Sequence, residues 1–286
     1  KLLAPDALDA VADCPTGELD LPMVSYPWDL VERNADTLRR HWTGDDRGSN
    51  GNVSSSAFML NPDQIHVGDR TRIRPTAVID AGGGPVFISN DVRVDVHTYI
   101  EGPAYIGPGS VIKPFCSVRA GTSLGPMSKV GGEISATITS GFVNKQHEGF
   151  LGHACVGSWV NLGAGTTNSN LKNTYGPITV RMGADSVATG RQFVGAVIGD
   201  FVRTGLGQLL PTGAVVGFGA MVANGGFSGP HVPSYTWMTT DGVTSTDPEK
   251  LREIAARIMA RRRVELTTEE AELFAKLPEL TQRYGV

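Results

Sequence analysis

Residues 106–130 read IGPGSVIKPFCSVRAGTSLGPMSKV, and an aliphatic residue recurs in this stretch at every sixth position. Toward both ends the same spacing holds without a gap in one run: Ile88, Val94, Ile100, Ile106, Ile112, Val118, Leu124 and Val130. A later run repeats it: Ile198, Thr204, Leu210, Val216 and Val222. A period of six matches neither a helix nor a simple strand and is typical of a hexapeptide parallel β-helix. Each six-residue unit then forms one side of a triangular coil and directs one aliphatic side chain inward.

The composition of the 286-residue chain excludes several classes of protein. A net charge of −4 gives no general case for nucleic-acid binding, and no apolar run approaches the length of a membrane helix. The three cysteines, Cys14, Cys116 and Cys155, are far apart and suggest reduced thiols in the cytoplasm. We therefore expect a cytoplasmic protein without nucleic-acid or membrane partners.

The periodicity divides the chain into three predicted parts. Residues 1–60 are not repetitive; a helical pattern begins near Trp28, with Asp29 as its cap, and we interpret the segment as a connector that remains after a missing N-terminal domain. Residues 61–240 form the all-β domain, a β-helix. Residues 241–286 form a C-terminal helical extension, with helices predicted over 246–263 and from Thr267 onward.

The repeat is interrupted twice, and interruptions of a solenoid often form loops on its binding face. Residues 131–149 lose the phase, which Phe150, Val156 and Leu162 recover. The second interruption runs from Asn168 to Gln192. We expect the functional site in this region.

His147 lies in the first interruption, in a polar setting. An imidazole is the natural general base near neutral pH, and acyl transfer to an amine needs such a base. It also needs N–H donors for the oxyanion, and the backbone of residues 163–166 offers them. From spacing alone, a solvated surface histidine is the favoured interpretation.

A metal site is a further alternative, because hexapeptide folds also hold zinc on three histidines. The close histidine pair of a carbonic-anhydrase-like site is absent, and we interpret His66, His97 and His153 as outward loop residues. We expect no metal in this chain. The run 261–263, three arginines, either complements a helix dipole or binds an anion.

Three blocks carry a specific resemblance: residues 144–152 (NKQHEGFLG), 159–166 (WVNLGAGT) and 169–176 (SNLKNTYG). Together with the hexapeptides they resemble the acetyltransferase part of the bifunctional glucosamine-1-phosphate acetyltransferase / N-acetylglucosamine-1-phosphate uridyltransferase family, in a bacterial branch labelled as sugar nucleotidyltransferases. The resemblance covers residues 65 to 240. It implies a left-handed β-helix, a homotrimer with sites between neighbours, and acetyl-CoA as co-substrate.

The resemblance also implies roles for individual residues. His147 matches the catalytic base, Asn170 an orienting catalytic asparagine, and Asn161 a substrate contact. The backbone contact to acetyl-CoA falls on Ala164. The coils that hold the coenzyme suggest three looser candidates: Gly205, Gly207 and Ala223.

This chain departs from the family pattern in three respects. A family tyrosine is replaced by Phe150, and the basic residues that clamp the sugar phosphate match Ser117, Ser135 and Gly176. Replacements for this clamp are open among Arg119, Lys129, Lys145 and Lys172. Of these we expect Arg119, Lys145 and Lys172 to bind substrate, together with Phe150. The Gly-rich motif of the family's nucleotidyltransferase domain is absent, so nucleotidyl transfer would require a domain that precedes Lys1 in the intact protein.

The sequence thus predicts an acyltransferase that N-acetylates an amino-sugar phosphate, glucosamine-1-phosphate first, in sugar-nucleotide biosynthesis. The alternative is a non-catalytic oligomerisation or regulatory module of a sugar-phosphate nucleotidyltransferase. Loss of the basic clamp favours the alternative, whereas the presence of His147, Asn161 and Asn170 together disfavours it.

Overall fold

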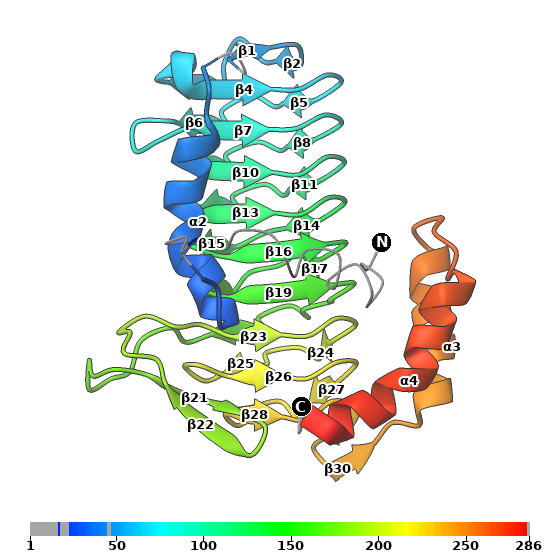
Figure 1. Cartoon of the computed structure of the whole chain (residues 1–286). Helices are drawn as coiled ribbons and strands as arrows, with labels where there is room; N and C mark the ends of the chain where they lie inside the picture. Colours follow the sequence, from blue (N-terminus) through cyan, green and yellow to red (C-terminus); the bar gives the residue numbers. More distant parts are fainter. Residues whose placement is uncertain (1–16, 18–22, 45–46, 285–286) are drawn as a thin grey trace.

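The computed structural model of the chain describes residue 17, residues 23–44 and residues 47–284. Short parallel strands stack into coils around one axis and form three faces (Figure 1). The coils wind in the left-handed sense, so the predicted left-handed parallel β-helix is confirmed. Cys14 lies outside the described residues.

Face 1 is a ten-stranded sheet. Its strands are β1 (Gly48–Ser49), β4 (Ile65–Val67), β7 (Val86–Ile88), β10 (Ala104–Ile106), β13 (Thr122–Leu124), β16 (Ile138–Gly141), β19 (Cys155–Ser158), β23 (Val197–Ile198), β26 (Val215–Val216) and β28 (His231–Val232).

Face 2 consists of two sheets that Asn161 joins through isolated bridges to Asn144 and Arg203. Its strands are β2 (Asn52–Val53), β5 (Arg72–Ile73), β8 (Arg93–Val94), β11 (Val111–Ile112), β14 (Lys129–Val130), β17 (Asn144–Lys145), β24 (Arg203–Thr204), β27 (Met221–Ala223) and β29 (Thr236–Thr239), and β30 (Gly242–Ser245) pairs antiparallel with β29.

Face 3 likewise consists of two sheets. Its strands are β3 (Phe58–Leu60), β6 (Val78–Asp80), β9 (Tyr99–Glu101), β12 (Ser117–Val118), β15 (Glu133–Ser135), β18 (Phe150–Gly152), β20 (Thr167–Asn168) and β25 (Leu209–Leu210).

The core is the stack of inward side chains that the period of six predicts. Ile88, Ile106 and Leu124 lie in register on face 1 and are fully buried. Each such aliphatic contributes about 1.5–3 kcal/mol when it leaves water. Because each coil shields the next, the stack needs its neighbours on both sides.

Residues 131–149 do not leave the β-helix, and the predicted interruption there is wrong. The coil is shortened: Ile134 pairs with Val118, and Thr139 pairs with Leu124. Lys145 then takes the inward position beside Val130. The period of six is not visible in the sequence here, because the turns are shortened and some inward residues are polar. The same shift places Leu151 inward, so Phe150 lies on the outer side of face 3 and does not restore the phase.

The second interruption is a real excursion from the coils. The chain leaves face 3 after β20, forms the hairpin β21 (Thr179–Met182) and β22 (Asp185–Ala188), and returns at β23. Buried Ile178, Val180 and Val194 pack with Trp28 and Val215. The excursion is therefore fixed against the β-helix by its own small core.

The predicted first helix is α2 (Pro27–His41), and it lies along face 1 rather than apart from it (Figure 1). The N-cap is Tyr26 and not the predicted Asp29, which is the third residue of the helix. The Asp29 carboxylate accepts hydrogen bonds from the backbone N–H groups of Ser25 and Tyr26, both at 2.9 Å. The β-helix itself begins at Gly48, before the predicted boundary at residue 61. A short 3₁₀ helix spans Pro62–Gln64.

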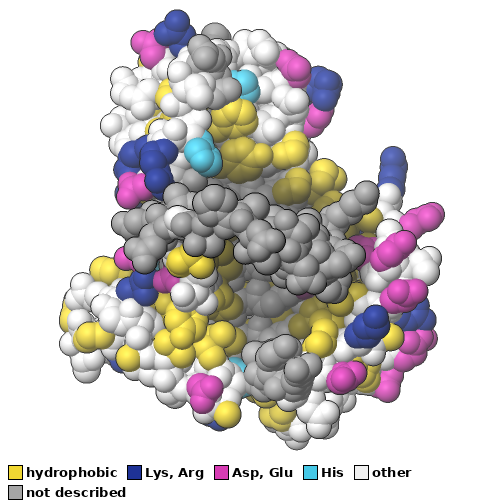
Figure 2. Space-filling view, viewed as in Figure 1, with side chains coloured by type: hydrophobic (Ala, Val, Ile, Leu, Met, Phe, Trp, Pro, Cys, Tyr) yellow, Lys and Arg dark blue, Asp and Glu magenta, His cyan; other side chains and the backbone are white. Residues whose placement is uncertain are grey.

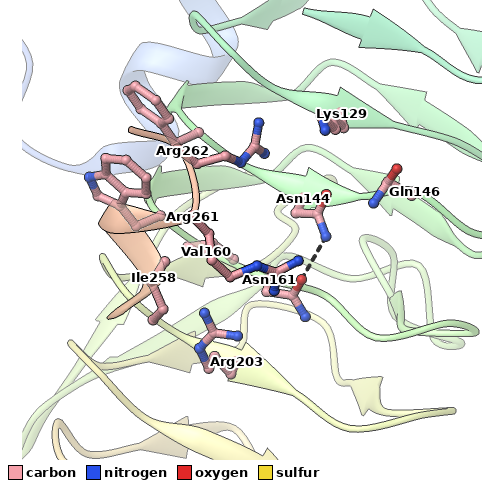
Figure 3. Close-up of a pocket in the computed structure, with 11 residues that line it drawn as sticks. Lys129, Asn144, Gln146, Val160, Asn161, Arg203, Ile258, Arg261 and Arg262 are labelled. Carbon is pink, nitrogen blue, oxygen red and sulfur yellow. Dashed lines mark hydrogen bonds between the residues drawn. The ribbon is translucent and has the colours of Figure 1, made fainter. Parts of the chain in front are cut away.

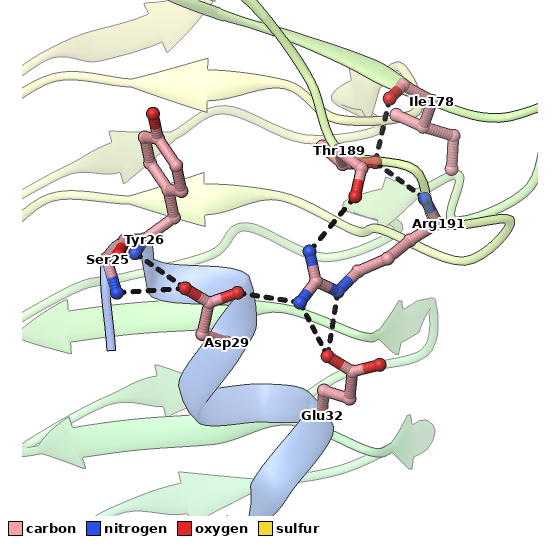
Figure 4. Close-up of polar contacts among 7 residues, drawn as sticks. All are labelled: Ser25, Tyr26, Asp29, Glu32, Ile178, Thr189 and Arg191. Atoms are coloured by element: carbon pink, nitrogen blue, oxygen red, sulfur yellow. Dashed lines mark hydrogen bonds and ion pairs between the residues drawn. The ribbon is translucent and has the colours of Figure 1, made fainter. Parts of the chain in front are cut away.

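A charged latch ties α2 to the excursion (Figure 4). Arg191 donates to Asp29 at 2.7 Å and to Glu32 at 2.6 Å, and it also donates to the Thr189 carbonyl. Burial alone would raise the pKa of Asp29, but the Ser25 and Tyr26 N–H groups and the charge of Arg191 lower it below its ordinary value. The latch joins segments 162 residues apart.

The C-terminal extension is helical, as predicted: α3 (Pro248–Ala260) and α4 (Thr268–Tyr284). Asp247 caps α3 by accepting from the Lys250 N–H. Both helices cover an aromatic corner, the turns between faces 1 and 2 that carry Phe142, Trp159, Phe201, Phe218 and Tyr235. Phe274 of α4 packs edge-on against Phe201 and Phe218, which anchors the extension.

Hydrophobic side chains also gather on the outer side of face 1 (Figure 2). His66, Phe87 and Tyr105 stack there as a ladder, with ring centroids 4.2 and 5.7 Å apart. Leu38 and Trp42, at the C-terminal end of α2, line a pocket together with Phe87 and Tyr105. The outer side of face 1 is therefore the surface on which α2 packs.

Replacing Arg191 with Gln is expected to lower the free energy of unfolding by about 1–2 kcal/mol, because Asp29 stays buried without its charged partner. Urea unfolding measures this change. As a control, Arg70→Gln breaks an ion pair with Asp91 that is exposed on both sides and should change nothing measurable. Equal stability of Arg191→Gln and wild type would show that the latch does not hold α2.

Candidate active site

The predicted catalytic and coenzyme residues share one edge of the β-helix, which we name the His147 corner. It consists of the turns between faces 2 and 3 on successive coils: residues 146–149, 163–165, 205–207 and 223–225. His147 and Ala164 lie on adjacent turns, and Gly205, Gly207 and Ala223 lie on the two turns beyond. Three coil spacings correspond to about 14 Å. The His147 side chain is exposed.

Backbone hydrogen bonds hold these turns against each other. The Gly165 N–H donates to the Glu148 carbonyl at 3.0 Å, and the Gly207 N–H donates to the Ala164 carbonyl at 2.7 Å. The turns approach so closely that a Cβ on Gly163 would lie 2.3 Å from the Gly205 oxygen. Only glycine fits there, and the corner therefore carries few side chains next to His147.

The Ala164 N–H is one of several N–H groups on this corner that have no partner among the described residues. The N–H groups of Gly163, Gly165 and Thr166 donate to Thr204 Oγ1, the Glu148 carbonyl and the Gly163 carbonyl. Among the described residues, no acceptor is found for the Ala164 N–H. A donor is thus available one coil away from His147.

Lys145 was predicted to contact substrate, and its position contradicts that role. Its side chain is 1% exposed and points into the β-helix. Its ammonium donates to the carbonyls of Gly131 (2.8 Å), His147 (3.0 Å) and Gly149 (2.7 Å). A buried ammonium requires such acceptors, and two of them, the carbonyls of His147 and Gly149, belong to the turn that carries His147. Lys145 is a positioning residue for that turn.

The interior also changes the ionisation of this lysine. Burial lowers the pKa of Lys145 to about 8, although the charge of Glu148 opposes the shift. An ionised Cys116 would oppose the shift as well, but burial raises the pKa of its thiol to about 12, so the thiol is neutral near pH 7.

Asn170 lies on a different edge, between faces 3 and 1, which we name the Asn170 corner. Its amide nitrogen lies 2.9 Å from Nδ1 of His153. The His153 ring stacks on Phe193 at 5.3 Å, and burial lowers its pKa, which favours the neutral ring. Within one chain, face 3 separates Asn170 from His147.

Two further candidates lie away from the His147 corner, whereas a third, Phe150, directly follows the turn that carries His147. Arg119, on the Asn170 corner, pairs with Glu101 at 2.9 Å and lies over the Tyr99 ring. Lys172 lies on the excursion and donates to the Pro177 carbonyl at 2.6 Å. Phe150 lies on face 3, where its ring fills the space beside Gly152.

Asn161 faces outward on face 2 and lines a pocket of about 180 Å³ (Figure 3). Its side-chain oxygen accepts from the Asn144 amide at 2.7 Å. Gln146, which directly precedes His147, also lines the pocket, so the pocket reaches the His147 corner. The wall opposite face 2 comes from the end of α3, with Ile258, Arg261 and Arg262.

The pocket is strongly basic. Lys129, Arg203, Arg261 and Arg262 line it, and none of the residues that line it is acidic. Burial and then the charge of Arg261 lower the pKa of Arg203, and the same causes lower that of Arg262. Burial, followed by four neighbouring cations, lowers the pKa of Lys129.

Sequence reasoning named Lys129 and left anion binding open for residues 261–263, but it missed Asn144, Gln146 and Arg203. A signal was present for two of them. Asn144 and Arg203 each precede an inward residue by one position, as Lys129 and Asn161 do, which places all four on the outer side of face 2. Nothing in the sequence indicates that α3 returns to this face.

None of the helices in the described part of the chain combines the length and apolarity needed to cross a membrane. Over the same residues, no three His, Cys, Asp or Glu side chains lie close enough to hold a metal ion.

The fold and the His147 corner define a hexapeptide-repeat β-helix protein. No family model matches the chain. It is 31% identical over 150 residues to the bifunctional protein GlmU of Acidithiobacillus ferrooxidans, which covers 51% of this chain and 32% of that protein. A bifunctional sugar-1-phosphate nucleotidylyltransferase/acetyltransferase of Sulfurisphaera tokodaii is 33% identical over 150 residues, covering 50% and 36%.

The chain therefore spans about a third of the length of these curated relatives. Among solved structures, a UDP-N-acetylglucosamine acyltransferase of Francisella novicida superposes with a TM-score of 0.40 at 16% identity, covering 83% of this chain and 88% of that one.

The buried amine gives a pH prediction. Between pH 8 and 10.5 the unfolded chain holds a proton on Lys145 that the folded chain has released, so stability rises with pH in this window. We expect the advantage in unfolding free energy of wild type over Lys145→Met to grow by about 2 kcal/mol between pH 7.5 and 9.5. Val130→Ala, its uncharged register partner, should give a profile parallel to wild type. A parallel profile for Lys145→Met would refute the shift.

Proposed function

We propose that the chain is an acetyl-CoA-dependent N-acetyltransferase that acts on an amino-sugar phosphate, with glucosamine-1-phosphate as the first candidate. The observation that carries the proposal is the unpaired Ala164 N–H one coil from His147 on the same corner. The named activities of the partial relatives, acetyl transfer included, support it.

In this proposal His147 acts as general base. It takes a proton from the amino group of the acceptor as the nitrogen attacks the thioester carbonyl of acetyl-CoA. The Ala164 N–H donates to the oxyanion of the tetrahedral intermediate or to the adjacent coenzyme. When the intermediate collapses, the C–S bond breaks and the coenzyme thiolate takes the proton from the imidazolium. No acyl-enzyme forms, since the amine attacks directly.

The small residues of the His147 corner suit the coenzyme arm. Gly205, Gly207 and Ala223 continue the corner beyond Ala164, and the latter two are exposed. An extended chain laid along these turns meets backbone groups and the exposed side chain of Leu206. Lys145 supports the arrangement from inside, because it fixes the carbonyl of His147.

Assembly as a homotrimer is part of the proposal. His147 is exposed and Asn170 lies on another edge of the same chain, so a closed site requires a neighbouring chain. A neighbour that presents its Asn170 corner to the His147 corner would unite the two groups. Nucleotidyl transfer is not proposed for these residues.

His147→Ala is expected to lower kcat by about 10²–10⁴, because the amine loses its base, with a small change in KM for acetyl-CoA. The assay is release of free coenzyme A with glucosamine-1-phosphate as acceptor. His97→Ala is the matched control, because His97 is exposed on the same line of turns, several coils away. Full activity of His147→Ala would overturn the assignment. Failure of wild type both to turn over and to bind coenzyme A would favour the structural module.

Ala223→Trp is expected to raise KM for acetyl-CoA at least tenfold while kcat at saturation changes little, because the indole covers the proposed path of the coenzyme. Steady-state kinetics at varied acetyl-CoA measures this. Asn173→Trp places the same ring on the exposed excursion and should leave both constants unchanged. An unaltered KM in Ala223→Trp would mean that the coenzyme does not run along this corner.

A further inference from the structure

Four cationic side chains from separate parts of the chain converge on the pocket of face 2. Lys129 comes from β14, Arg203 from β24, and Arg261 and Arg262 from the segment after α3. In Figure 3 their charged groups surround the same space as the Asn144–Asn161 pair. Residues 129 and 203 lie on face 2 with two coils between them, those of Asn144 and Asn161.

No carboxylate in the described part of the chain pairs with any of these cations. Several arginines elsewhere in the described part of the chain do pair with carboxylates, as Arg191 does with Asp29 and Glu32. Like charges held together in a partly buried space repel one another. Burial is the main cause of the lowered pKa values of Arg203 and Arg262, and repulsion by Arg261 is the second cause. Such a cluster is costly unless an anion occupies it.

The docking of the C-terminal helices makes the cluster possible. Leu251, Ala255 and Met259 of α3 are buried against the aromatic corner, and Phe274 of α4 inserts beside them. This contact holds the end of α3 over face 2. Cations also suit the end of a helix dipole, but that effect does not require the side chains to point into a pocket shared with Lys129 and Arg203.

We propose that this pocket is the binding site for the phosphate group of a small-molecule ligand. Guanidinium forks match phosphate oxygens bidentately, and a phosphate monoester supplies the missing negative charge. The amides of Asn144, Gln146 and Asn161 can bind the hydroxyl groups of the same ligand. Ser117 and Ser135, which resemble the family's phosphate clamp by position, lie on face 3, away from this pocket.

The inference rests on the proposed function for the identity of the ligand. Gln146 joins the pocket to His147, so the phosphate of an amino-sugar acceptor bound here would lie beside the general base. The 3′-phosphate of coenzyme A is the other source of the same chemistry. Binding measurements distinguish the two, and they do not depend on turnover.

The experiment measures dissociation constants by calorimetry for two ligand pairs: glucosamine-1-phosphate against glucosamine, and coenzyme A against 3′-dephospho-coenzyme A. For one pair, wild type should prefer the phosphorylated member at least tenfold. Arg203→Gln and Arg262→Gln should each reduce that preference at least fivefold. Arg263→Gln removes the same charge from the adjacent residue, which does not line the pocket, and should retain it.

The melting temperature of each variant, measured by thermal unfolding, shows whether the variant is folded. Because Arg203→Gln and Arg262→Gln remove a repelled charge, their melting temperatures without ligand should equal or exceed that of wild type. Loss of preference for the sugar phosphate assigns the pocket to the acceptor, and loss for coenzyme A assigns it to the coenzyme; both support a phosphate site. Unchanged preferences, or the same loss in Arg263→Gln, would overturn it. His147→Ala should keep the preference for the phosphorylated ligand. If wild type shows this preference but no acetyl transfer, only the transferase proposal fails.

Discussion

The whole structure depends on the interior of the triangular coil, which the inward aliphatic side chains of the three faces fill. Ile88, Ile106 and Leu124 fill it on face 1 without exposure to water. This constraint leaves no room for chemistry inside a coil. Functional groups must therefore lie at the corners, on the outer sides of the faces, or on segments that leave the coils. The candidate site uses all three: the turn of His147, the row from Lys129 to Arg203, and the end of α3.

Lys145 is the exception, and it explains how a corner can be rigid without large side chains. An aliphatic residue in its place could not satisfy the carbonyls of Gly131, His147 and Gly149. The cost is the burial of an amine whose pKa falls to about 8. The benefit is a defined turn at His147, where glycines alone would leave the backbone free. At this position the core lacks the hydrophobic stabilisation of an aliphatic side chain, and Lys145 instead fixes the geometry of the His147 corner.

The two appended helical segments act on different edges of the β-helix. α2 lies on face 1 and is tied to the excursion by Arg191, which fixes the surroundings of His153 and Asn170. α3 and α4 cover the aromatic corner and bring Arg261 and Arg262 to face 2. Neither is a separate unit beside the β-helix, since each contributes side chains to the environment of a candidate site.

The sequence by itself determined the β-helix, because a period of six in Ile, Val and Leu permits few other structures. Through a long specific block it also singled out His147, Asn161 and Ala164 as candidates. It did not reveal that residues 131–149 continue the coils, because Thr139 and Lys145 are polar and the turns are shortened. Nor did it reveal that Lys145 is buried. Only the tertiary structure decided that Asn170 lies on another edge from His147, and that Arg203 and Arg262 share a pocket. Inward periodicity is a local property of each coil, whereas the meeting of distant side chains depends on how excursions and helices pack back onto the faces.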